Sequence, residues 1–383
     1  MTTHVFVVDI KTFKYHLEYM FAGTGAKKRQ SPFLTNSAVS YHWKAEQMLV
    51  GMVADISRIR IGDKVIFYLQ AKGTNQGTFF GVFKVASLPF FDENDGNNYL
   101  VNQTDKGLSF RILIEPDEVY AKGLTEHEFL DSLQGKNHPS DMCWSLIYRK
   151  LKANRGCTMI ADYEFNDFLQ QVRAKNNNNY LVSNHFTFDS TNNEICIAPS
   201  TQPYLGRRNS LDILPRLLNK GHNFNNAPNS NAFEAHLQAY LTQNFDNAIL
   251  SPLLVPYPGQ SCWIGNEVAC GVGMQRIDVM IKQETDTEVV IRLIELKCTA
   301  PYLEIATKQL PWYLEWLSYY VIPKYAGKSI RVIPTIIANG VLTTQLQAQY
   351  QNCGYAIQNV NVEPIQYIGF NITANNINFI RYL

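Results

Sequence analysis

The chain has 383 residues, of which 46% are hydrophobic and 17% are charged, and its formal net charge is +1. This length is too great for one compact core, so two domains are expected. The near-neutral charge excludes a global basic field, so a nucleic acid would have to be bound by local patches. The sequence contains no run of about 18 apolar residues, so no membrane span is expected.

The cysteines indicate the compartment. There are 7 of them, and none form a CxxC pair. An odd number without such pairs argues against a disulfide framework or a zinc ribbon and favours a reducing, cytoplasmic location. The first residues also lack a basic segment followed by a long apolar stretch, so no signal peptide is expected.

The first half of the chain predicts a small β-rich domain with peripheral helices over residues 1–175. Strands are expected at "HVFVVDI", "KVIFYL", "TFFGVFKVAS" and "SFRILIEPDEVY", and a helix at "ADYEFNDFLQQVRAK". A stretch rich in Asn, Ser, Thr and Pro then predicts a linker over residues 176–210. A short hairpin is expected within it, at Tyr180–Asp189 and Glu194–Ala198.

Two segments of this half carry a resemblance. "ISRIRIGDKVIFYL" followed by "GTFFGVFKVAS" resembles the EVE and YTH-like branch of the PUA superfamily, and "YRKLKANRGCTMIADYEFNDFLQQV" fits the same pattern. The resemblance covers about residues 1–175 and implies a PUA-like β-barrel with helices that recognises a modified base flipped from the duplex. Tyr41 and Trp43 of "SYHW" would then stack on the base, although a core position is the alternative for Trp43.

Basic side chains of this half could contact phosphates, although a solvated loop is the ordinary reading of such residues. They are Lys27, Lys28, Arg29, Arg58, Arg60, Arg149, Lys150, Lys152 and Arg155.

The second half, residues 211–383, alternates helices and strands, which predicts a mixed sheet flanked by helices. Helices are expected at "AFEAHLQAYLTQNF", "LEIATKQLPWYLEWLSYYV" and "TTQLQAQYQN", and strands at "QRIDVMIK", "VVIRLIELK" and "SIRVIPTIIAN". The expected fold class of the whole chain is therefore α/β and α+β in two domains.

The strand "VVIRLIELK" ends in two charges. Glu295 and Lys297 share one face because side chains alternate along a strand, and burying them without partners would be costly. Hairpin pairing with the preceding strand would bring Asp278 near them. Asp278, Glu295 and the carbonyl of Leu296 can hold Mg²⁺, with Mn²⁺ as a substitute. Lys297 would then serve the attacking water and stabilise the phosphate.

The order of these elements resembles the PD-(D/E)XK nuclease superfamily. "GMQRIDVMI" and "IELK" fit its strand motifs, with Ile277 where the name-giving proline would stand. "QLPWY" looks like the Gln-x-x-x-Tyr element of the RecB-like branch. The resemblance covers about Asn231–Asn339. It adds Glu234, as support for the metal shell, and Gln309 to a catalytic set that otherwise consists of Asp278, Glu295 and Lys297.

Together these patterns predict a Mg²⁺-dependent DNA endonuclease, most consistent with a restriction enzyme whose first domain recognises DNA. Double-strand cutting usually takes two active sites, so a homodimer is expected. A RecB-like repair nuclease acting on ends or irregular DNA is the first alternative, and a non-catalytic nucleic-acid reader is the second. The second domain of such a reader would be a scaffold or dimerisation module. For the single residues, the alternatives are a salt pair between Glu295 and Lys297, a solvated position for Glu234, and surface or packing positions for Gln309 and Tyr313.

Overall fold

The computed structural model describes residues 1–25, 43–72, 76–92, 99–146, 156–200, 202–222, 230–271 and 275–383. The chain is a mixed α/β protein that divides into two compact units. Unit 1 consists of Met1–Val39 and Asp55–Asp212, and unit 2 consists of Ser40–Ala54 and Ile213–Leu383. The fold class expected from the sequence therefore agrees with the structure. The closed PUA-like barrel stays an expectation.

The two units divide the chain differently from the expected ranges. The segment expected to be a linker belongs to unit 1, and Ser40–Ala54 belongs to unit 2. Most of that second segment lies in helix α2 (Trp43–Ser57). Its Glu46 is buried against Arg216, which lies far along the chain, with 2.8 Å between Oε1 and Nη2. A contact between residues so far apart in the sequence produces no local sequence pattern from which the domain of α2 could be predicted.

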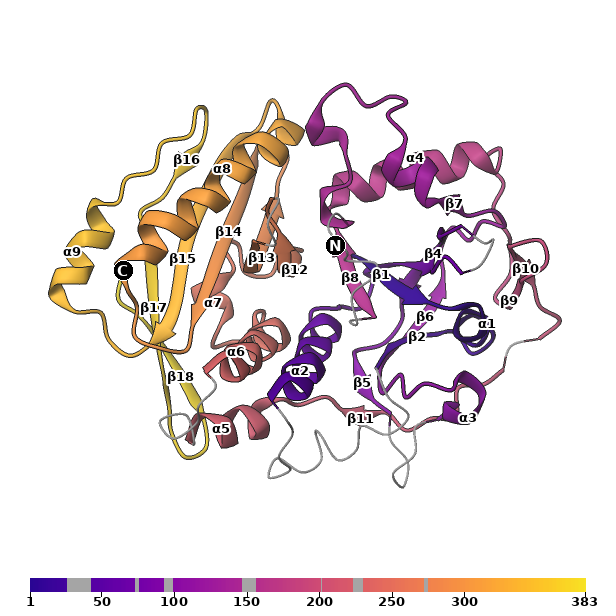
Figure 1. Cartoon of the computed structure of the whole chain (residues 1–383), viewed down its shortest axis with the longest axis horizontal. Coiled ribbons are helices and arrows are strands. Elements are labelled where there is room, and N and C mark those ends of the chain that lie inside the picture. The colour runs from indigo at the N-terminus through magenta and orange to yellow at the C-terminus, as the bar shows by residue number, and fades with distance from the viewer. Residues whose placement is uncertain are drawn as a thin grey trace. The chain divides into compact units, whose positions relative to one another are not determined.

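Unit 1 is built on a nine-stranded sheet with the order β11-β5-β6-β4-β3-β1-β8, in which β2 also pairs with β6 and β7 with β4. A separate hairpin, β9-β10, lies where the sequence predicted one. The expected strands and the expected helix are all present (Figure 1). The elements of unit 1 are β1 (Thr3–Val8), α1 (Ile10–Glu18), β2 (Phe21–Thr24), β3 (Lys64–Leu69), β4 (Thr78–Val85), β5 (Phe90–Phe91), α3 (Val101–Thr104), β6 (Phe110–Pro116), β7 (Leu124–Thr125), η1 (His127–Asp131), η2 (Pro139–Asp141), η3 (Trp144–Leu146), β8 (Cys157–Ile160), α4 (Asp162–Lys175), β9 (Phe186–Asp189), β10 (Glu194–Ile197) and β11 (Asn209–Ser210).

The core of unit 1 is rich in aromatic rings. Phe13 of α1 contacts Phe67 and Phe80, with ring centroids 5.4 and 5.2 Å apart. A fully buried cation, Arg111, is held by Asp92 at 3.2 Å and by carbonyl oxygens. This arginine is therefore part of the fold, since burial without partners would be costly.

Unit 2 is built on a seven-stranded sheet with the order β12-β13-β14-β15-β17-β18, in which β16 also pairs with β15. Strand β13 is antiparallel to both of its neighbours, β12 and β14, whereas β15 runs parallel to both β14 and β17. Besides α2, its elements are α5 (Leu214–His222), α6 (Ser230–Asn244), α7 (Ser251–Leu254), β12 (Trp263–Ala269), β13 (Arg276–Glu284), β14 (Glu288–Lys297), η6 (Ile305–Gln309), α8 (Leu310–Tyr320), η7 (Ile322–Tyr325), β15 (Ser329–Asn339), α9 (Thr344–Asn352), β16 (Asn361–Val362), β17 (Gln366–Ile372) and β18 (Ile377–Arg381).

The long helix expected around Pro311 is present and runs without a break over residues 303–320. Its first part contains a π-helical turn, η6, and Pro311 follows this turn as the second residue of α8. A proline inside a helix removes one backbone hydrogen bond, and the change from π-helical to α-helical spacing lies at this point. Figure 1 shows α8 running alongside β14 and β15. The strand β14 lies between β13 and β15, and its residues Val289–Leu293 are buried on both faces, as a central strand requires.

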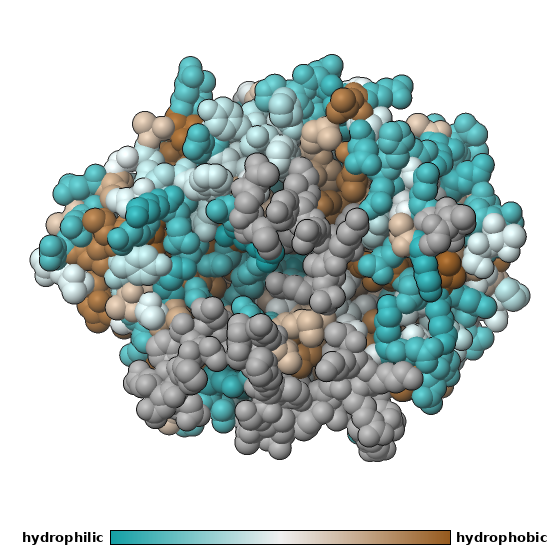
Figure 2. All heavy atoms as spheres, viewed as in Figure 1, coloured by the Kyte–Doolittle hydropathy of each residue, from teal (hydrophilic) through white to brown (hydrophobic). Residues whose placement is uncertain are grey.

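The visible surface is mostly hydrophilic, with hydrophobic side chains in small groups (Figure 2). No helix within the described ranges is long and apolar enough to span a membrane. The seven cysteines all lie within the described ranges, and no disulfide joins any of them.

Candidate functional site

Asp278 and Glu295 lie opposite one another on neighbouring strands. The antiparallel register pairs Val279 of β13 with Ile294 of β14, which puts the preceding Asp278 across from Glu295. The backbone N–H of Leu296 donates a hydrogen bond of 2.7 Å to the Asp278 carboxylate. The hairpin thus brings these two carboxylates to one end of the sheet, as the sequence predicted.

Lys297 joins this pair to helix α6. Its ammonium donates to Glu295 and, at 3.3 Å, to Oε1 of Glu234. It also donates to the carbonyl of Leu296 at 2.9 Å. The carbonyl expected to bind a metal therefore already accepts one hydrogen bond, and its second lone pair remains.

Glu295 is the most enclosed of the acidic groups, with 2% of its surface exposed. The hydroxyl of Tyr313, from α8, lies 2.8 Å from Oε2 of Glu295 and 3.0 Å from the carbonyl oxygen of Arg276. Tyr313 of α8 therefore contacts Oε2 of Glu295, whereas Lys297 contacts Oε1. Both oxygens of Glu295 are engaged.

Carboxyl groups dominate the site. Burial raises the pKa of Asp278 well above its ordinary value, and the neighbouring charges of Glu295 and Glu267 raise it further. Burial also raises the pKa of Glu234. For Lys297, burial alone would lower the pKa, but the surrounding carboxylates raise it above the ordinary value and keep the ammonium protonated. The site contains three carboxyl groups and one lysine, so a bound cation would stabilise the ionised forms of the carboxyl groups.

Two residues of the site were not expected from the sequence. Gln238, one helical turn after Glu234 on α6, donates through Nε2 to the carbonyl oxygen of Asp278 at 3.0 Å and to Glu267 at 3.3 Å. Glu267 of β12 is also paired with Arg276 at 2.6 Å. The helical spacing from Glu234 was the one available signal for Gln238. Glu267 had none, because its strand was not predicted.

Gln309 lies at the end of η6, one turn before Tyr313. Its side-chain oxygen is buried and has no hydrogen-bond partner within the described part of the chain. Among those residues no hydrogen bond joins Gln309 to the carboxylates, whereas Tyr313 is bonded to Glu295.

The expected base-binding residues cannot be placed. Tyr41 lies outside the described residues, and so does the side chain of Trp43, the first residue of α2. Seven of the expected phosphate contacts also lie outside the described residues, namely Lys27, Lys28, Arg29, Arg149, Lys150, Lys152 and Arg155.

The expectation for Arg58 is wrong. Its side chain is fully buried, ion-paired with Asp55 at 2.9 Å and bonded to the sulfur of Cys157 at 3.4 Å. A phosphate cannot reach it. Arg60 is half-buried and donates to the carbonyl oxygen of Ser57 at 2.6 Å.

Within the described ranges, no group of three or more His, Cys, Asp and Glu side chains is arranged to hold a metal ion. The expected ligand set is smaller, two carboxylates and a carbonyl. Oxygen ligands suit a hard divalent cation such as Mg²⁺, which usually keeps several waters and takes only one or two carboxylates. Asp278 and Glu295 fit that requirement.

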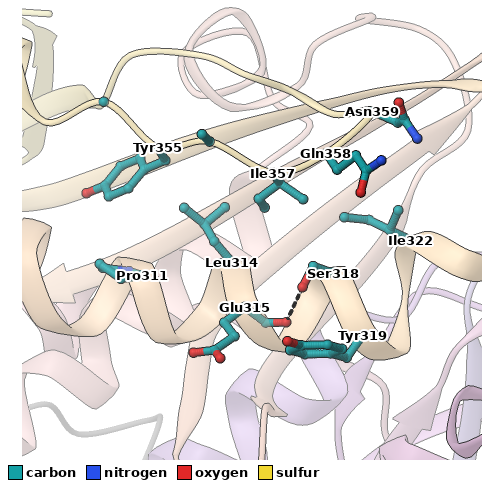
Figure 3. A pocket seen from close by; sticks show the side chains of 12 residues that line it. Pro311, Leu314, Glu315, Ser318, Tyr319, Ile322, Tyr355, Ile357, Gln358 and Asn359 are labelled. Carbon is teal, nitrogen blue, oxygen red and sulfur yellow. Dashed lines mark hydrogen bonds between the residues drawn. The ribbon is translucent and has the colours of Figure 1, made fainter.

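The outer face of α8 borders a separate groove of about 590 Å³. Leu314, Ser318 and Tyr319 line it from the helix, and Tyr355 and Ile357 line it from the chain that follows α9 (Figure 3). Tyr313 is not part of this lining, because it turns toward Glu295. The groove and the carboxylate site therefore use different faces of one helix.

No family model matches the chain, and no curated protein matches it. Among solved structures, the chain is similar to a hypothetical protein from Leishmania major, at 11% identity over 46% of this chain and 96% of that chain, with a TM-score of 0.30. A protein from Pseudomonas syringae is similar at 11% identity over 44% of this chain and 98% of that chain, with a TM-score of 0.27. Human THYN1 in complex with DNA containing 5-methylcytosine is similar at 6% identity over 45% of this chain and 97% of that chain, with a TM-score of 0.24. These scores are too low to assign a function.

Proposed function

We propose that unit 2 hydrolyses phosphodiester bonds of DNA with the help of Mg²⁺ or Mn²⁺. The observation that carries this proposal is the convergence of Asp278, Glu295 and Lys297 at one end of β13 and β14. Each of the three side chains is held in place by a hydrogen bond from or to its surroundings, as a preorganised site requires.

Asp278 and Glu295 would hold the cation. A divalent ion bound there supplies Lewis-acid polarisation of a phosphoryl oxygen and lowers the pKa of water. Burial and the charge of Glu295 raise the pKa of Asp278, and a cation bound between the two carboxylates would offset both effects.

Lys297 would stabilise the phosphate. Glu295 and Glu234 hold its ammonium from two sides, and Tyr313 fixes the orientation of Glu295. A protonated lysine in such a position favours the additional negative charge that develops on the phosphate during displacement.

The arrangement favours an enzyme over the alternative of a simple salt pair. A surface salt pair lies at an edge and is solvated, whereas Glu295 is buried in a central strand. The resemblance to PD-(D/E)XK nucleases rests on an order of four elements, a helix with Glu234, a strand with Asp278, a strand with Glu295 and Lys297, and a further helix. Helix α6, strands β13 and β14 and helix α8 follow one another in that order. A reader of nucleic acid needs none of these buried charges.

A second part of the proposal concerns the DNA substrate and the oligomeric state. We propose a restriction-type endonuclease that acts as a homodimer, with unit 1 recognising DNA through a PUA-like fold and selecting a modified base. Cleavage of methylated, hydroxymethylated and plain duplexes, compared side by side, tests the selection. Equal rates on all three would refute it.

The test of catalysis is cleavage of supercoiled DNA by the full chain in Mg²⁺, in Mn²⁺ and in a chelator. We expect cleavage in the two metals alone. Asp278→Asn and Glu295→Gln should lose both cleavage and calorimetric Mg²⁺ binding, whereas Lys297→Met should lose cleavage and still bind the ion, since lysine is not a ligand.

Lys282→Met is the control, because Lys282 is a buried lysine of the same hairpin that also pairs with a carboxylate, Glu284, at 3.0 Å. It should keep its activity. A wild-type chain that cuts in chelator, or a fully active Glu295→Gln variant, would overturn the proposal.

A further inference from the structure

Trp312 of α8 is exposed but held in a fixed position. Its exposed fraction is 43%. The indole Nε1 donates a hydrogen bond of 2.8 Å to the carbonyl oxygen of Cys270. The ring also lies against Gly271, where an added Cβ would come within 3.2 Å of Nε1, and the φ of +126° at Gly271 itself favours glycine. The backbone thus anchors one side of the ring, and much of the remainder is open to solvent.

This ring stands beside the candidate site. Trp312 directly precedes Tyr313, whose hydroxyl contacts Glu295. The backbone N–H of Cys270, whose carbonyl oxygen anchors the ring, donates to the carbonyl oxygen of Gln275 at 3.1 Å. Gln275 directly precedes β13, the strand that contains Asp278. Burial and the charges of Glu295 and Asp278 raise the pKa of the Cys270 thiol to about 12, which agrees with their proximity.

A cation accompanies the ring. Lys308 of η6 lies about one helical turn before Trp312 and is exposed. It forms no ion pair with any of the described residues. The helical stretch runs without a break from η6 into α8, so side chains four residues apart lie on nearly the same face. An anchored aromatic face and a free ammonium next to a phosphodiester-cleaving site form a pair that matches the two parts of a nucleotide, its base and its phosphate.

We propose that Trp312 and Lys308 form a subsite for an unpaired nucleotide of the DNA strand being cut, with the base stacked on the indole and a phosphate against the ammonium. Within a duplex both faces of a base are covered by its neighbours, so such a platform takes a base from a strand end or a single-stranded region. This inference rests on the phosphodiester hydrolysis proposed for unit 2 and adds to it a subsite for a nucleotide that is unpaired near the cut.

The test is the binding of a labelled single-stranded oligodeoxynucleotide, followed by fluorescence anisotropy in Ca²⁺ to avoid cleavage. Trp312→Ala should weaken binding roughly five- to 150-fold, the range for loss of one stacked base. Trp312→Phe should retain most of the affinity. Lys308→Gln should reduce the salt dependence of binding by about one phosphate contact.

Tyr319→Ala is the matched control, because Tyr319 lies on the same helix with an exposed fraction of 59% but lines the separate groove. It should bind like the wild type. Should Trp312→Ala fail to fold, a scan of the wild type with an abasic nucleotide at each position decides instead. One position should show the same loss of affinity, and Trp312→Phe should show a smaller loss there.

An abasic scan with no sensitive position, or unchanged binding by a folded Trp312→Ala variant, would overturn the subsite. Preference for the corresponding RNA strand would overturn the assignment to DNA. Cleavage of supercoiled DNA is measured separately. If cleavage depends on metal but Trp312→Ala does not change binding, the subsite is wrong and the nuclease proposal stands. If binding depends on Trp312 but the chain does not cleave DNA, the nuclease proposal is wrong and the subsite stands.

Discussion

Tyr313 and Glu295 are joined by a hydrogen bond of 2.8 Å that connects α8 to the end of β14. The tyrosine ring is buried, and burial together with the charge of Glu295 raises the pKa of its hydroxyl, so the phenol stays protonated and donates. A donor of this kind fixes the orientation of a carboxylate before any cation or substrate binds.

Tyr313→Phe should therefore lower activity without unfolding the chain. The ring keeps its packing, but Glu295 loses the donor to Oε2, and loss of such a supporting bond typically costs about 10- to 100-fold in metal affinity or activity. The cleavage rate as a function of Mg²⁺ concentration measures the effect. Tyr319→Phe, on the exposed face of the same helix, should leave the curve unchanged. A Tyr313→Phe curve that overlays the wild type would show that the bond does not serve the site.

Asp278→Asn should stabilise the metal-free protein. Burial and the charges of Glu295 and Glu267 raise the pKa of Asp278, and a carboxyl group whose pKa is raised by folding destabilises the folded state at neutral pH. Each kcal/mol gained should raise the Tm by about 2–4 °C for a domain of this size. We expect the gain in chelator only, because Mg²⁺ should stabilise the wild type and not the variant. The control is Asp286→Asn, in the exposed turn of the same hairpin. A lower Tm for Asp278→Asn in chelator would contradict the assigned crowding.

The carboxylate pair could be predicted from the sequence because the rule behind it is local. Side chains alternate along "VVIRLIELK", and a short turn returns the chain antiparallel, so Asp278 and Glu295 had to lie close together. Strand β12 was not predicted, since "WIGNEVA" contains Gly, Asn and Glu, which are depleted in strands. With β12 missing, neither Glu267 nor its bond with Gln238 could be expected.

For Arg58 the sequence predicted a functional contact that the structure does not allow. A cluster of basic residues in "SRIR" suggested phosphate contacts, but composition does not reveal which side chains are buried. In the structure Asp55, one turn earlier on α2, pairs with Arg58. Likewise, nothing in the periodicity of α2 shows that Ser40–Ala54 belongs to unit 2. That placement depends on partners about 170 residues away.

Gln238 should affect the site through the backbone of Asp278. Gln238→Met keeps the volume but removes the bonds to the Asp278 carbonyl oxygen and to Glu267, so cleavage should fall and the Mg²⁺ requirement should rise. Gln283→Met is the matched control. Gln283 is also buried and also donates to carbonyl oxygens, those of Tyr257 and Gln260, but at the other end of β13. Both variants should lose similar stability, and the Mg²⁺ dependence should change in Gln238→Met alone. An equal change in the Mg²⁺ dependence of both variants would show that Gln238 contributes to packing and has no specific effect on the site.

The ion pairs of Glu46 should stabilise the packing of α2 in unit 2, and this stabilisation should depend on pH. The carboxylate is 1% exposed, and Arg216 and Lys220 each reach it at 2.8 Å, with His236 at 3.3 Å. Glu46→Gln would leave Arg216 buried without its counter-charge, and removing one partner of a buried pair costs about 3–5 kcal/mol. Denaturant unfolding at neutral pH measures this loss. Glu363→Gln, at the pair with Arg331 in which each side chain is 25% exposed, should cost about 1 kcal/mol or less.

The loss caused by Glu46→Gln should shrink in acid. Burial alone would raise the pKa of Glu46, but His236, Lys220 and Arg216 lower it from 4.5 to about 2. A carboxyl group whose pKa is lowered by folding stabilises the protein fully above its unfolded pKa, and this stabilisation disappears as the pH falls through the folded value. The difference in stability between wild type and Glu46→Gln should therefore be constant above pH 4.5 and decrease between pH 4.5 and about 2. A difference that stays constant, or grows, over that interval would show that the ion pairs do not hold α2.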